Sequence, residues 1–412
     1  MPGKKRQRTE DTPVLYEKRV TRSQLEGERK AKKAKEEEDA VKERQRLWEE
    51  RQAEIRGRHP DPVGDCGDGN LYVAFVEVGQ GDFAVMSTPG GKVIVFDGGS
   101  LSTDDEDAGG KMNPESKTAF TKRLHSVLTD EKFLGNRNVI DILILTHPDS
   151  DHYNKLAAVL GDRYTIDKCY HSGNFDKYSV AKTSAFLDPI TRIVQKVVKS
   201  HDPIEKKAAG EVTLQGRPVQ AKDEENTVDR LDDEGGILIL DEGKSCQISI
   251  IAAGITYEYK NDGSNDTNRG SIVTLVEANG AKVLMMGDAT KNTEQFLLNT
   301  AAKRLTKLNL VQAAHHGSVL TSSSQEFVDL VDPAEAVASA GRKIPKHRHP
   351  SDDVIKRYVE RLETSERPEI SSHTTYVWPG LGEGKPYSYK STQNVFSTGS
   401  RGTFIRKFGA ST

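Results

Sequence analysis

Cysteine is scarce in this chain, and long apolar runs are missing from it. The 412 residues include three cysteines, Cys66, Cys169 and Cys246, which lie far apart in the sequence. This spacing argues against a disulfide framework and against a zinc site built from thiolates. There is no run of about eighteen apolar residues and no apolar signal region at the N-terminus. We therefore expect an intracellular protein that does not enter membranes, cytoplasmic or, in a eukaryotic cell, nuclear.

Net charge is also small, but only because two parts of the chain cancel. The formal net charge is -3, yet residues 1–58 carry 18 Lys and Arg against 13 Asp and Glu, a net charge of +5. This leaves 41 Lys and Arg against 49 Asp and Glu for residues 59–412, a net charge of -8. The N-terminal segment is therefore expected to be physically separate from the rest.

The N-terminal segment has the composition of a solvated helix. Residues from Ser23 to Arg58 are rich in Ala, Glu, Lys and Arg, but their apolar residues are too sparse for a stripe that faces a core. We expect residues 1–58 to be a charged extension, partly helical and partly disordered, through which a partner protein could bind. Its tip, GKKRQR at 3–8, is interpreted as a solubilising tail in preference to a nuclear localisation signal or a nucleic-acid-binding arm. Residues 59–70, rich in Pro, Gly and Asp, are predicted to be a linker.

The folded part is expected to begin at residue 71, where apolar segments alternate with glycine turns. Such short strands joined by glycine turns favour an antiparallel sheet, and later strands alternate with helical stretches. Together they predict an α/β (α+β) fold in which helices cover sheets. Residues 172–245 are longer and more charged than a simple connection, so we predict an insertion or lid there. Strands are expected at 71–78, 83–88, 92–97, 141–145, 166–170, 247–252, 271–276, 282–286, 308–313 and 335–339, and a helix at about 116–134.

Side chains that bind metals follow several of these apolar runs. The loop THPDSDH, directly after the strand at 141–145, places four such residues within six positions. The end of a strand is a favoured place for a site, because the sheet fixes the backbone while the loop exposes the side chain. One Asp or His there is usually a cap or a satisfied polar group. The candidates at these ends are Asp97, His147, Asp149, Asp151, His152, Asp288, His315 and His316.

These motifs resemble a known superfamily. HPDSDH resembles the HxHxDH loop of metallo-β-lactamase-fold hydrolases, with Asp149 in place of the second His. A closer resemblance, over about 71–408 and in the same order, is to the metallo-β-lactamase-like domain of the ComEC competence family. It implies an αββα four-layer sandwich and a relative that lacks the family's membrane-embedded domain. The matching motifs are VGQGD at 78–82, PGGKVIVFDGG at 89–99, THPDSDH at 146–152, NRGSIVTLV at 268–276, VLMMGDA at 283–289, AHHGS at 314–318, HP at 349–350 and STGSRGTFI at 397–405.

The resemblance implies two divalent metals that share one carboxylate. His147 and Asp149 would hold one metal, and Asp151 and His152 would hold the other. Asp288 would bridge them. Asp149 makes the site harder than the usual histidine does, so we expect Mn²⁺ in preference to Zn²⁺ or Mg²⁺. A metal with an open coordination position lowers the pKa of its bound water toward neutrality, which suits hydrolysis.

Other residues are assigned by the same resemblance. His349 would complete the second metal site. His315 and His316 form a histidine doublet. If this doublet is extended, only one of its rings faces the site, because neighbouring side chains then point in opposite directions. The choice between His315 and His316 stays open. Asp97 is expected to orient a ligand or a metal-bound water, and it joins Asp151 and Asp288 as a residue expected to take part in catalysis.

Departures from the family pattern concern the surroundings of the site. Asn154 and Lys155 replace two small residues that usually follow the metal loop. The superfamily's third histidine has no clear counterpart. His171 is a candidate, although a partly exposed surface histidine is the favoured interpretation. VGQGD, with Gly79, Gly81 and Asp82, could line the site or simply form a strand turn.

The function expected from these ligands is metal-dependent hydrolysis of a phosphodiester, with a nucleic acid as substrate. Lys346 and Arg348 would meet phosphate, and Ser318 would contact substrate or cap the next helix. One alternative is a hydrolase of small molecules, such as a lactone or a nucleotide. Others are a preference for chain ends and a non-catalytic adaptor that recruits a partner through its N-terminal helix. The motifs describe the metal and not the substrate.

Overall fold

In the computed structural model the chain divides into two compact units, Met1–Trp48 and Glu49–Thr412. In the first unit, the described residues Lys32, Lys35 and Asp39 are helical and exposed. No helix among the described residues is long and apolar enough to cross a membrane. The described residues of the second unit are 66–101, 121–122, 124–160, 164–172, 178, 194–200, 227–231, 236–255, 258–341, 347–365, 372–380 and 384–409.

The first large sheet contains the N-terminal strands of the second unit. Its strand order is β17-β1-β2-β3-β4-β5-β6-β7. The strands β1, β2 and β3 pair antiparallel through glycine turns, as predicted, whereas β3 to β7 are parallel. The strands are β1 (Leu71–Phe75), β2 (Phe83–Ser87), β3 (Val93–Asp97), β4 (Val139–Leu145), β5 (Thr165–His171), β6 (Val194–Ser200), β7 (Thr227–Leu231) and β17 (Phe404–Phe408).

The second large sheet has the order β16-β13-β12-β11-β10-β9-β8. Strands β8 to β11 are antiparallel, and β11, β12, β13 and β16 are parallel. A separate hairpin joins β14 (His373–Val377) to β15 (Tyr387–Ser391). The strands of the second sheet are β8 (Ile237–Asp241), β9 (Cys246–Ala252), β10 (Val273–Ala278), β11 (Ala281–Met285), β12 (Leu310–Gln312), β13 (Glu335–Ala338) and β16 (Val395–Ser397).

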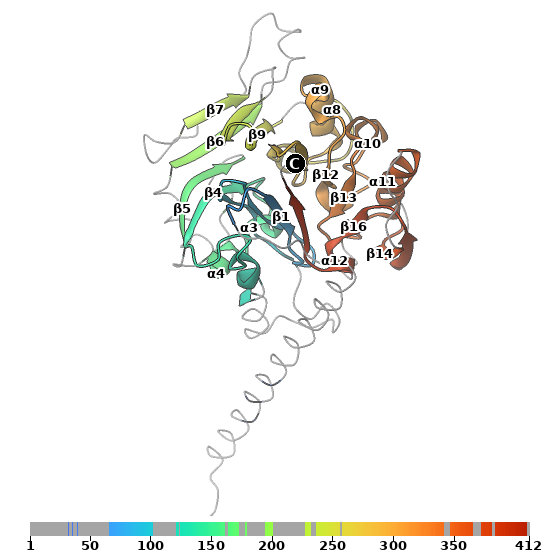
Figure 1. The fold of residues 1–412 in the computed structure, drawn as a ribbon. Coiled ribbons are helices and arrows are strands. Elements are labelled where there is room, and N and C mark those ends of the chain that lie inside the picture. The colour runs from blue at the N-terminus through green and yellow to red at the C-terminus, as the bar shows by residue number, and fades with distance from the viewer. Residues whose placement is uncertain are drawn as a thin grey trace, which may run out of the picture. The chain divides into compact units, whose positions relative to one another are not determined.

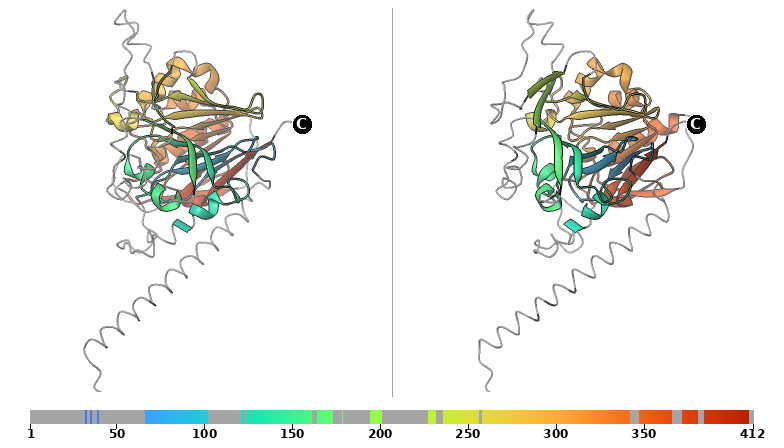
Figure 2. Two further views of the ribbon diagram at one scale, coloured as in Figure 1. Left: turned by 90° about the vertical axis from the view of Figure 1, so that its left-hand side faces the viewer. Right: turned by 60° about the vertical axis from the view of Figure 1, so that its left-hand side comes forward.

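The two sheets and the helices outside them form four layers, with an apolar core between each pair of neighbouring layers (Figures 1 and 2). Leu71, Val73 and Phe75 of β1 belong to the core between the sheets, whereas Tyr72 and Ala74 face a second core. This alternation follows from the two-residue period of a strand. A third core lies between the second sheet and its helices. The predicted αββα four-layer sandwich is confirmed.

The helices cover the outer face of each sheet. On the first sheet they include α3 (Ser150–Tyr153) and α4 (Leu156–Leu160), and residues 121–122 and 124–128 within the predicted helix are helical. On the second sheet, α8 (Lys291–Thr300) contributes Phe296 and Leu297 to the core, and α11 (Asp352–Thr364) contributes Tyr358. The helices along the second half of the chain are α7 (Asp266–Arg269), α8 (Lys291–Thr300), α9 (Ala302–Leu305), the 3-10 turn η2 (His315–Gly317), α10 (Gln325–Val331), α11 (Asp352–Thr364) and α12 (Thr398–Arg401).

Two segments predicted from the sequence, the insertion and the linker, include residues that belong to the folded sheets or contact them. Part of the predicted insertion, 172–245, forms β6 and β7, which extend the first sheet, and β8, which starts the second. It is therefore not only a lid. The end of the predicted linker also belongs to the folded unit, because the Cys66 backbone N–H donates to the Glu131 carbonyl at 2.7 Å.

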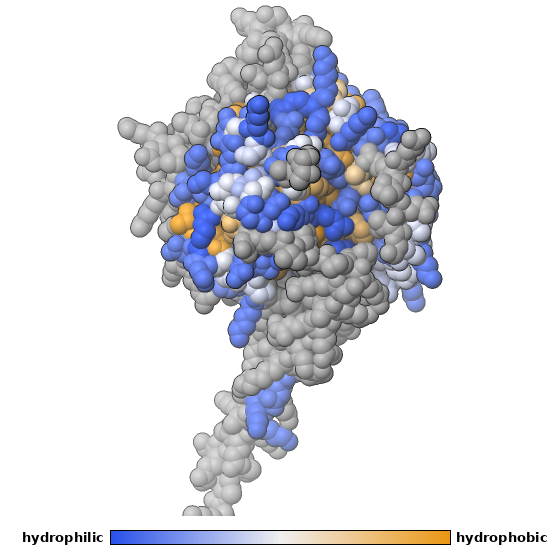
Figure 3. Space-filling model, in the orientation of Figure 1, coloured by the Kyte–Doolittle hydropathy of each residue, from blue (hydrophilic) through white to orange (hydrophobic). Residues whose placement is uncertain are grey.

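Hydrophilic residues predominate on the face drawn in Figure 3. Among the described residues, the exposed large hydrophobic side chains belong to separate segments of the chain: Leu101, Leu238, Leu320 and Tyr387. Scattered exposed apolar residues are normal for a soluble surface. The polar cluster at the strand ends is therefore the feature that points to function.

Candidate metal centre

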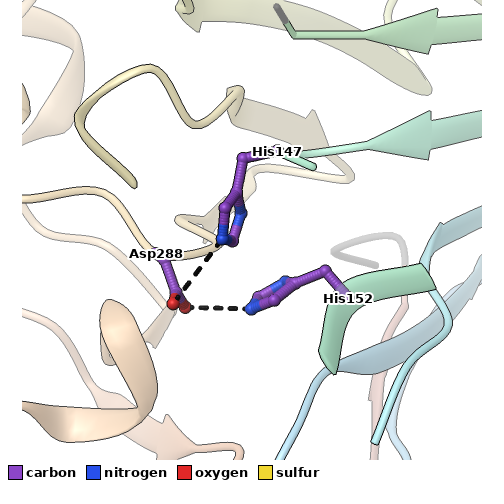
Figure 4. A group of neighbouring side chains, drawn as sticks. All are labelled: His147, His152 and Asp288. Carbon is purple, nitrogen blue, oxygen red and sulfur yellow. Dashed lines mark ion pairs between the residues drawn. The ribbon is translucent and has the colours of Figure 1, made fainter. Parts of the chain in front are cut away.

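The buried carboxylate of Asp288, just after β11, lies at the centre of the cluster. Each of its oxygens faces a different pair of imidazoles. Oδ2 lies 3.7 Å from Nε2 of His147 and 3.5 Å from Nε2 of His315. Oδ1 lies 3.2 Å from Nε2 of His152 and 3.5 Å from Nε2 of His316. Figure 4 shows His147, from the loop after β4, and His152, from the helix α3 (Ser150–Tyr153), pointing at this carboxylate. The geometry thus divides the cluster into two halves that share Asp288.

The other two carboxylates of the THPDSDH loop extend one half each. Asp149 Oδ2 lies 3.5 Å from His147 Nε2, and Asp151 Oδ2 lies 3.4 Å from His316 Nε2. Asp149 and Asp151 are separated by one residue across the start of α3, so their side chains point to different halves. The side chain of Asp149 is 41% exposed, whereas that of Asp151 is 13% exposed. The half that contains Asp149 is therefore the one open to solvent.

Hydrogen bonds at Nδ1 aim the imidazoles at the centre. His152 Nδ1 bonds Asp97 Oδ2 at 2.7 Å, and His316 Nδ1 bonds the Ser339 carbonyl at 2.7 Å. The Thr146 hydroxyl donates to Asp97, so it accepts from His147 Nδ1, at 3.1 Å. With the proton on Nδ1, the Nε2 lone pair of each ring is free to bind a cation. His315 Nδ1 in turn contacts the Thr321 hydroxyl at 2.7 Å.

The cluster fits a divalent metal. The Nε2 atoms of His147, His152 and His316 and Oδ1 of Asp288 are buried without a hydrogen-bond partner. Leaving several such atoms unsatisfied is costly. Two atoms that each lie about 2.1 Å from one ion, at a tetrahedral angle, are about 3.4 Å apart, and the contacts around Asp288 are near this distance. Three sets of the described residues could hold an ion: His147 with His152 and Asp288, Asp151 with His152 and His316, and Asp82 with Asp97 and His152.

Without metal, opposite charges balance one another in the cluster. Burial alone would raise the pKa of Asp288, but the imidazoles of His316, His315 and His152 hold it well below its usual range. Burial would lower the pKa of His316, but Asp288 and Asp151 raise it to about 9. A divalent cation would replace these imidazole protons as the partner of the carboxylates.

The doublet differs from the expectation for an extended segment. His315 has φ 49° and His316 has φ 56°, both in the left-handed region, within the 3-10 turn η2. Because the backbone turns here, the two side chains do not alternate as in a strand. Both rings face Asp288. The condition of that expectation, an extended backbone, is therefore not met.

Other predicted residues lie at the edge of the cluster. The ring of His349 lies 5.8 Å from that of His315 and 6.2 Å from that of His316. Like His315 and Asp149, it belongs to none of the three metal-compatible sets of the described residues. Arg348 is exposed next to it, and Lys346 lies outside the described residues. Ser318 is buried at the end of η2 and does not cap the next helix, because Ser324 caps α10.

His171 is not the partly exposed histidine that was expected. It is buried at the end of β5, and its ring packs edge-on against Tyr178, with 6.0 Å between ring centroids. Burial lowers its pKa to about 4, which keeps the ring neutral. His171 lies outside the metal-compatible sets among the described residues.

Glycines let the FDGG and VGQGD loops approach the ligand loop. A Cβ on Gly99 would lie 2.1 Å from the Asp151 carbonyl carbon, and one on Gly81 would lie 2.8 Å from the Asp151 oxygen. Asn154, which departs from the family pattern, accepts from the Ser100 N–H and donates to the Ser100 carbonyl, both at 2.9 Å. VGQGD therefore supports the site as well as forming a turn.

Replacing Gly99 by Ala is expected to displace the ligand loop. The added methyl group would meet backbone atoms that cannot rotate away, and overpacking of this kind costs about 1–3 kcal/mol. Thermal unfolding should shift down, and metal binding should weaken. Gly280→Ala, which adds a methyl group to open space, is the control for metal binding. Equal metal affinity for Gly99→Ala and the native protein would contradict the proposed packing.

Replacing Asp97 by Asn is expected to misorient His152. Asp97 accepts from the Thr146 N–H at 2.7 Å and the Thr146 hydroxyl at 2.6 Å in addition to His152. An amide offers one acceptor oxygen for these three donors. Loss of such an orienting partner lowers metal affinity about 10–100-fold, which calorimetric titration with Mn²⁺ would measure. Unchanged affinity would mean that Asp97 does not orient a ligand; Asp241→Asn, at the exposed end of β8, is the control.

Sequence reasoning did not identify two buried amides beside the cluster. Asn268 Nδ2 lies 3.5 Å from Asp288 Oδ2 and 3.3 Å from His315 Nε2, although its motif, NRGS, had been noted. Gln312, just before the AHH turn, donates to Asp82. Its position at the end of an apolar strand was the only available signal.

Among known proteins, solved structures are similar to this chain in fold. No family model matches this chain, and no curated protein matches it. YhfI from Bacillus subtilis, a metallo-β-lactamase fold protein, is 10% identical over 82% of this chain and 100% of its own, with a TM-score of 0.38. The short form of human tRNase Z (ELAC1) is 14% identical over 65% and 91%, with a TM-score of 0.36. Yeast PDE1 is 11% identical over 71% and 93%, with a TM-score of 0.32.

Proposed function

We propose that this protein is a metal-dependent hydrolase and that its substrate is a phosphodiester of a nucleic acid. The observation that carries the proposal is the division at Asp288, where one carboxylate oxygen faces His147 and His315 and the other faces His152 and His316. A carboxylate that faces two sets of nitrogen ligands is suited to bridging two metals.

The residues of the chain have separate tasks in this proposal. Two divalent metals bound here would supply an activated water and a positive charge for the attacking and leaving oxygens. Asp288 would join the two halves, and Asp97 would hold the ring of His152. Asp149, 41% exposed, and His315, 20% exposed, mark the side from which a substrate could approach. Asp151 lies deeper, with its side chain 13% exposed, and it would accept a proton in the reaction.

Two arguments support a nucleic-acid phosphodiester. A pair of metals acts as a clamp for the in-line displacement of a phosphate ester, and the motifs resemble a family that handles DNA. Arg348 is exposed beside His349, at the edge of the cluster, where it could meet a phosphate. The -8 charge of residues 59–412 disfavours strong binding to DNA by charge alone. We therefore expect the metals themselves to supply much of the attraction for the substrate.

We favour Mn²⁺ in this site. Each half contains a carboxylate besides Asp288, namely Asp149 in one and Asp151 in the other. Carboxylate oxygens suit harder cations than a purely imidazole site does. A hydrolase of small molecules would use the same ligands, so substrate comparison must decide between the two.

The test is hydrolysis of labelled single-stranded DNA, double-stranded DNA, RNA and a small chromogenic phosphodiester, each with Mn²⁺, Mg²⁺ or Zn²⁺. Metal-dependent cutting of a polymer, lost in Asp288→Ala and kept in Asp241→Ala, is the expected result. Hydrolysis of the small diester alone would favour a small-molecule enzyme. A folded protein that binds metal but cleaves none of these substrates would contradict phosphodiester hydrolysis and favour the adaptor.

A further inference from the structure

A buried side-chain contact joins the VGQGD loop of the first sheet to the end of β12 in the second sheet. The Gln312 side-chain amide, at the end of β12 in the second sheet, donates to Asp82 Oδ2. Asp82 lies just before β2 in the first sheet, 230 positions away in the sequence. Both residues are buried, with 3% exposure each. A buried contact between distant loops at a site implies a shared task for the two side chains.

Gln312 holds the segment that leads to Asp288. Its side-chain carbonyl accepts from the Met286 N–H at 2.8 Å and from the Gly287 N–H at 3.1 Å. These are the two residues directly before Asp288. Strands β11 and β12 are adjacent and parallel, but their paired residues end at Leu284 and Val311. The amide of Gln312 therefore continues the contact between the strands at the point where the ladder ends.

Asp82 holds the other ligand loop. Its backbone N–H donates to the Asp151 carbonyl at 3.1 Å, and its carbonyl accepts from the Gly99 N–H at 3.0 Å. Carboxylate oxygens of Asp82 and Asp97 and a nitrogen of His152 lie within 4.8 Å of one another. Asp82 thus contacts the THPDSDH loop through its backbone and Gln312 through its side chain.

We propose that Asp82 and Gln312 are positioning residues that fix the distance between the THPDSDH loop and Asp288. The inference rests on the proposed metal centre, because this distance decides whether Asp288 can bridge both halves. Neither residue needs to touch a metal or a substrate. The amide is required at 312 because it must accept from two backbone N–H groups and donate to a carboxylate at the same time.

Exchanging the two functional groups tests the proposal. In Gln312→Glu, one carboxylate oxygen still accepts from Met286 and Gly287, but the other faces the Asp82 carboxylate, so two acceptors meet. In Asp82→Asn with Gln312→Glu, the new amide donates to the new carboxylate, and the net charge equals that of the native protein. The pair therefore restores the donor and acceptor pattern with its direction reversed. Gln247→Glu, which faces Asp241 on an exposed strand end, is the matched control.

The readouts are the affinity for Mn²⁺ by calorimetry, the thermal unfolding of the metal-free protein and hydrolysis where a substrate is known. We expect Gln312→Glu to bind Mn²⁺ about 10–100-fold more weakly, as for the loss of a partner that orients a ligand. The exchanged pair should recover most of this loss. The control Gln247→Glu should bind like the native protein.

Several outcomes would overturn the proposal. One is a native-like Mn²⁺ affinity for Gln312→Glu; another is an exchanged pair that binds no better than Gln312→Glu. If Gln312→Glu does not fold, Asp82→Asn decides, since the asparagine carbonyl can still accept from Gln312. It should fold and bind within about threefold of the native affinity, well short of the loss expected for a missing partner, and a larger loss would contradict the contact. The affinity for Mn²⁺ ranks the variants even if no substrate is cleaved. Failure of the proposed hydrolase function would therefore be distinguishable from failure of this positioning role.

Discussion

Replacing Asp288 by Ala is expected to abolish metal binding and to lower kcat/KM by about a thousandfold or more, as for the loss of a central charge-stabilising group. Both halves of the cluster lose their shared carboxylate, so the imidazoles no longer face a common anion. The fold should persist, because Asp288 lies beyond the end of β11 and contributes no apolar surface to the cores. Elemental analysis of the purified variant and its hydrolysis rate would measure both effects.

The control for this prediction is Asp241→Ala. Asp241 also ends a strand, β8, but it is exposed, and its carboxylate accepts from the Gly243 N–H and the Gln247 side chain. It should keep native metal content and rate. An Asp288→Ala protein that retains two metals would contradict the bridging role, and one that fails to fold would point to a structural role for this carboxylate.

Replacing either histidine of the doublet by Ala is expected to remove one metal each. The ring of His315 faces Oδ2 of Asp288, whereas the ring of His316 faces Oδ1 of Asp288 and also Asp151. We expect each variant to bind one equivalent of Mn²⁺ instead of two, with activity lowered about a hundredfold or more, since both metals take part in the displacement. Metal titration of His315→Ala and His316→Ala beside the native protein would measure the stoichiometry.

The two variants need not be equal. His316 is buried, whereas the side chain of His315 is 20% exposed, so loss of His316 should disturb the deeper half and lower the thermal stability more. His347→Ala, on the loop before His349, is a control from the same stretch of histidines. Two equivalents of metal bound to His315→Ala would show that, of these two histidines, only His316 is a ligand.

Strands and strand-end ligands were the predictable part of this protein. Buried strands such as β4 and β11 end in apolar runs, ILIL and VLM, so the residue at which each run stops is visible in the sequence. His147 and Asp288 stand shortly after such ends, and the structure brings them together. Their proximity follows from the layering of the two sheets, which the order of motifs had already suggested.

Backbone turns and distant partners were not predictable. The left-handed conformation of His315 and His316 depends on how the chain leaves β12, and two histidines carry no local signal for it. Gln312 appears in the sequence as one polar residue in an apolar run, and its partner Asp82 lies 230 positions away. Strands β6 and β7 lie in a charged segment, and no apolar run there predicted them.

The most direct test of the metal centre is a crystal structure of the protein grown with Mn²⁺, with anomalous scattering used to locate the metal. We predict two peaks, one on each side of the Asp288 carboxylate, the first beside Nε2 of His147 and the second beside Nε2 of His152. Each should lie about 2.0–2.2 Å from its nitrogen ligands. Ordered side chains in their present positions with no peak between them, at saturating Mn²⁺, would contradict the account.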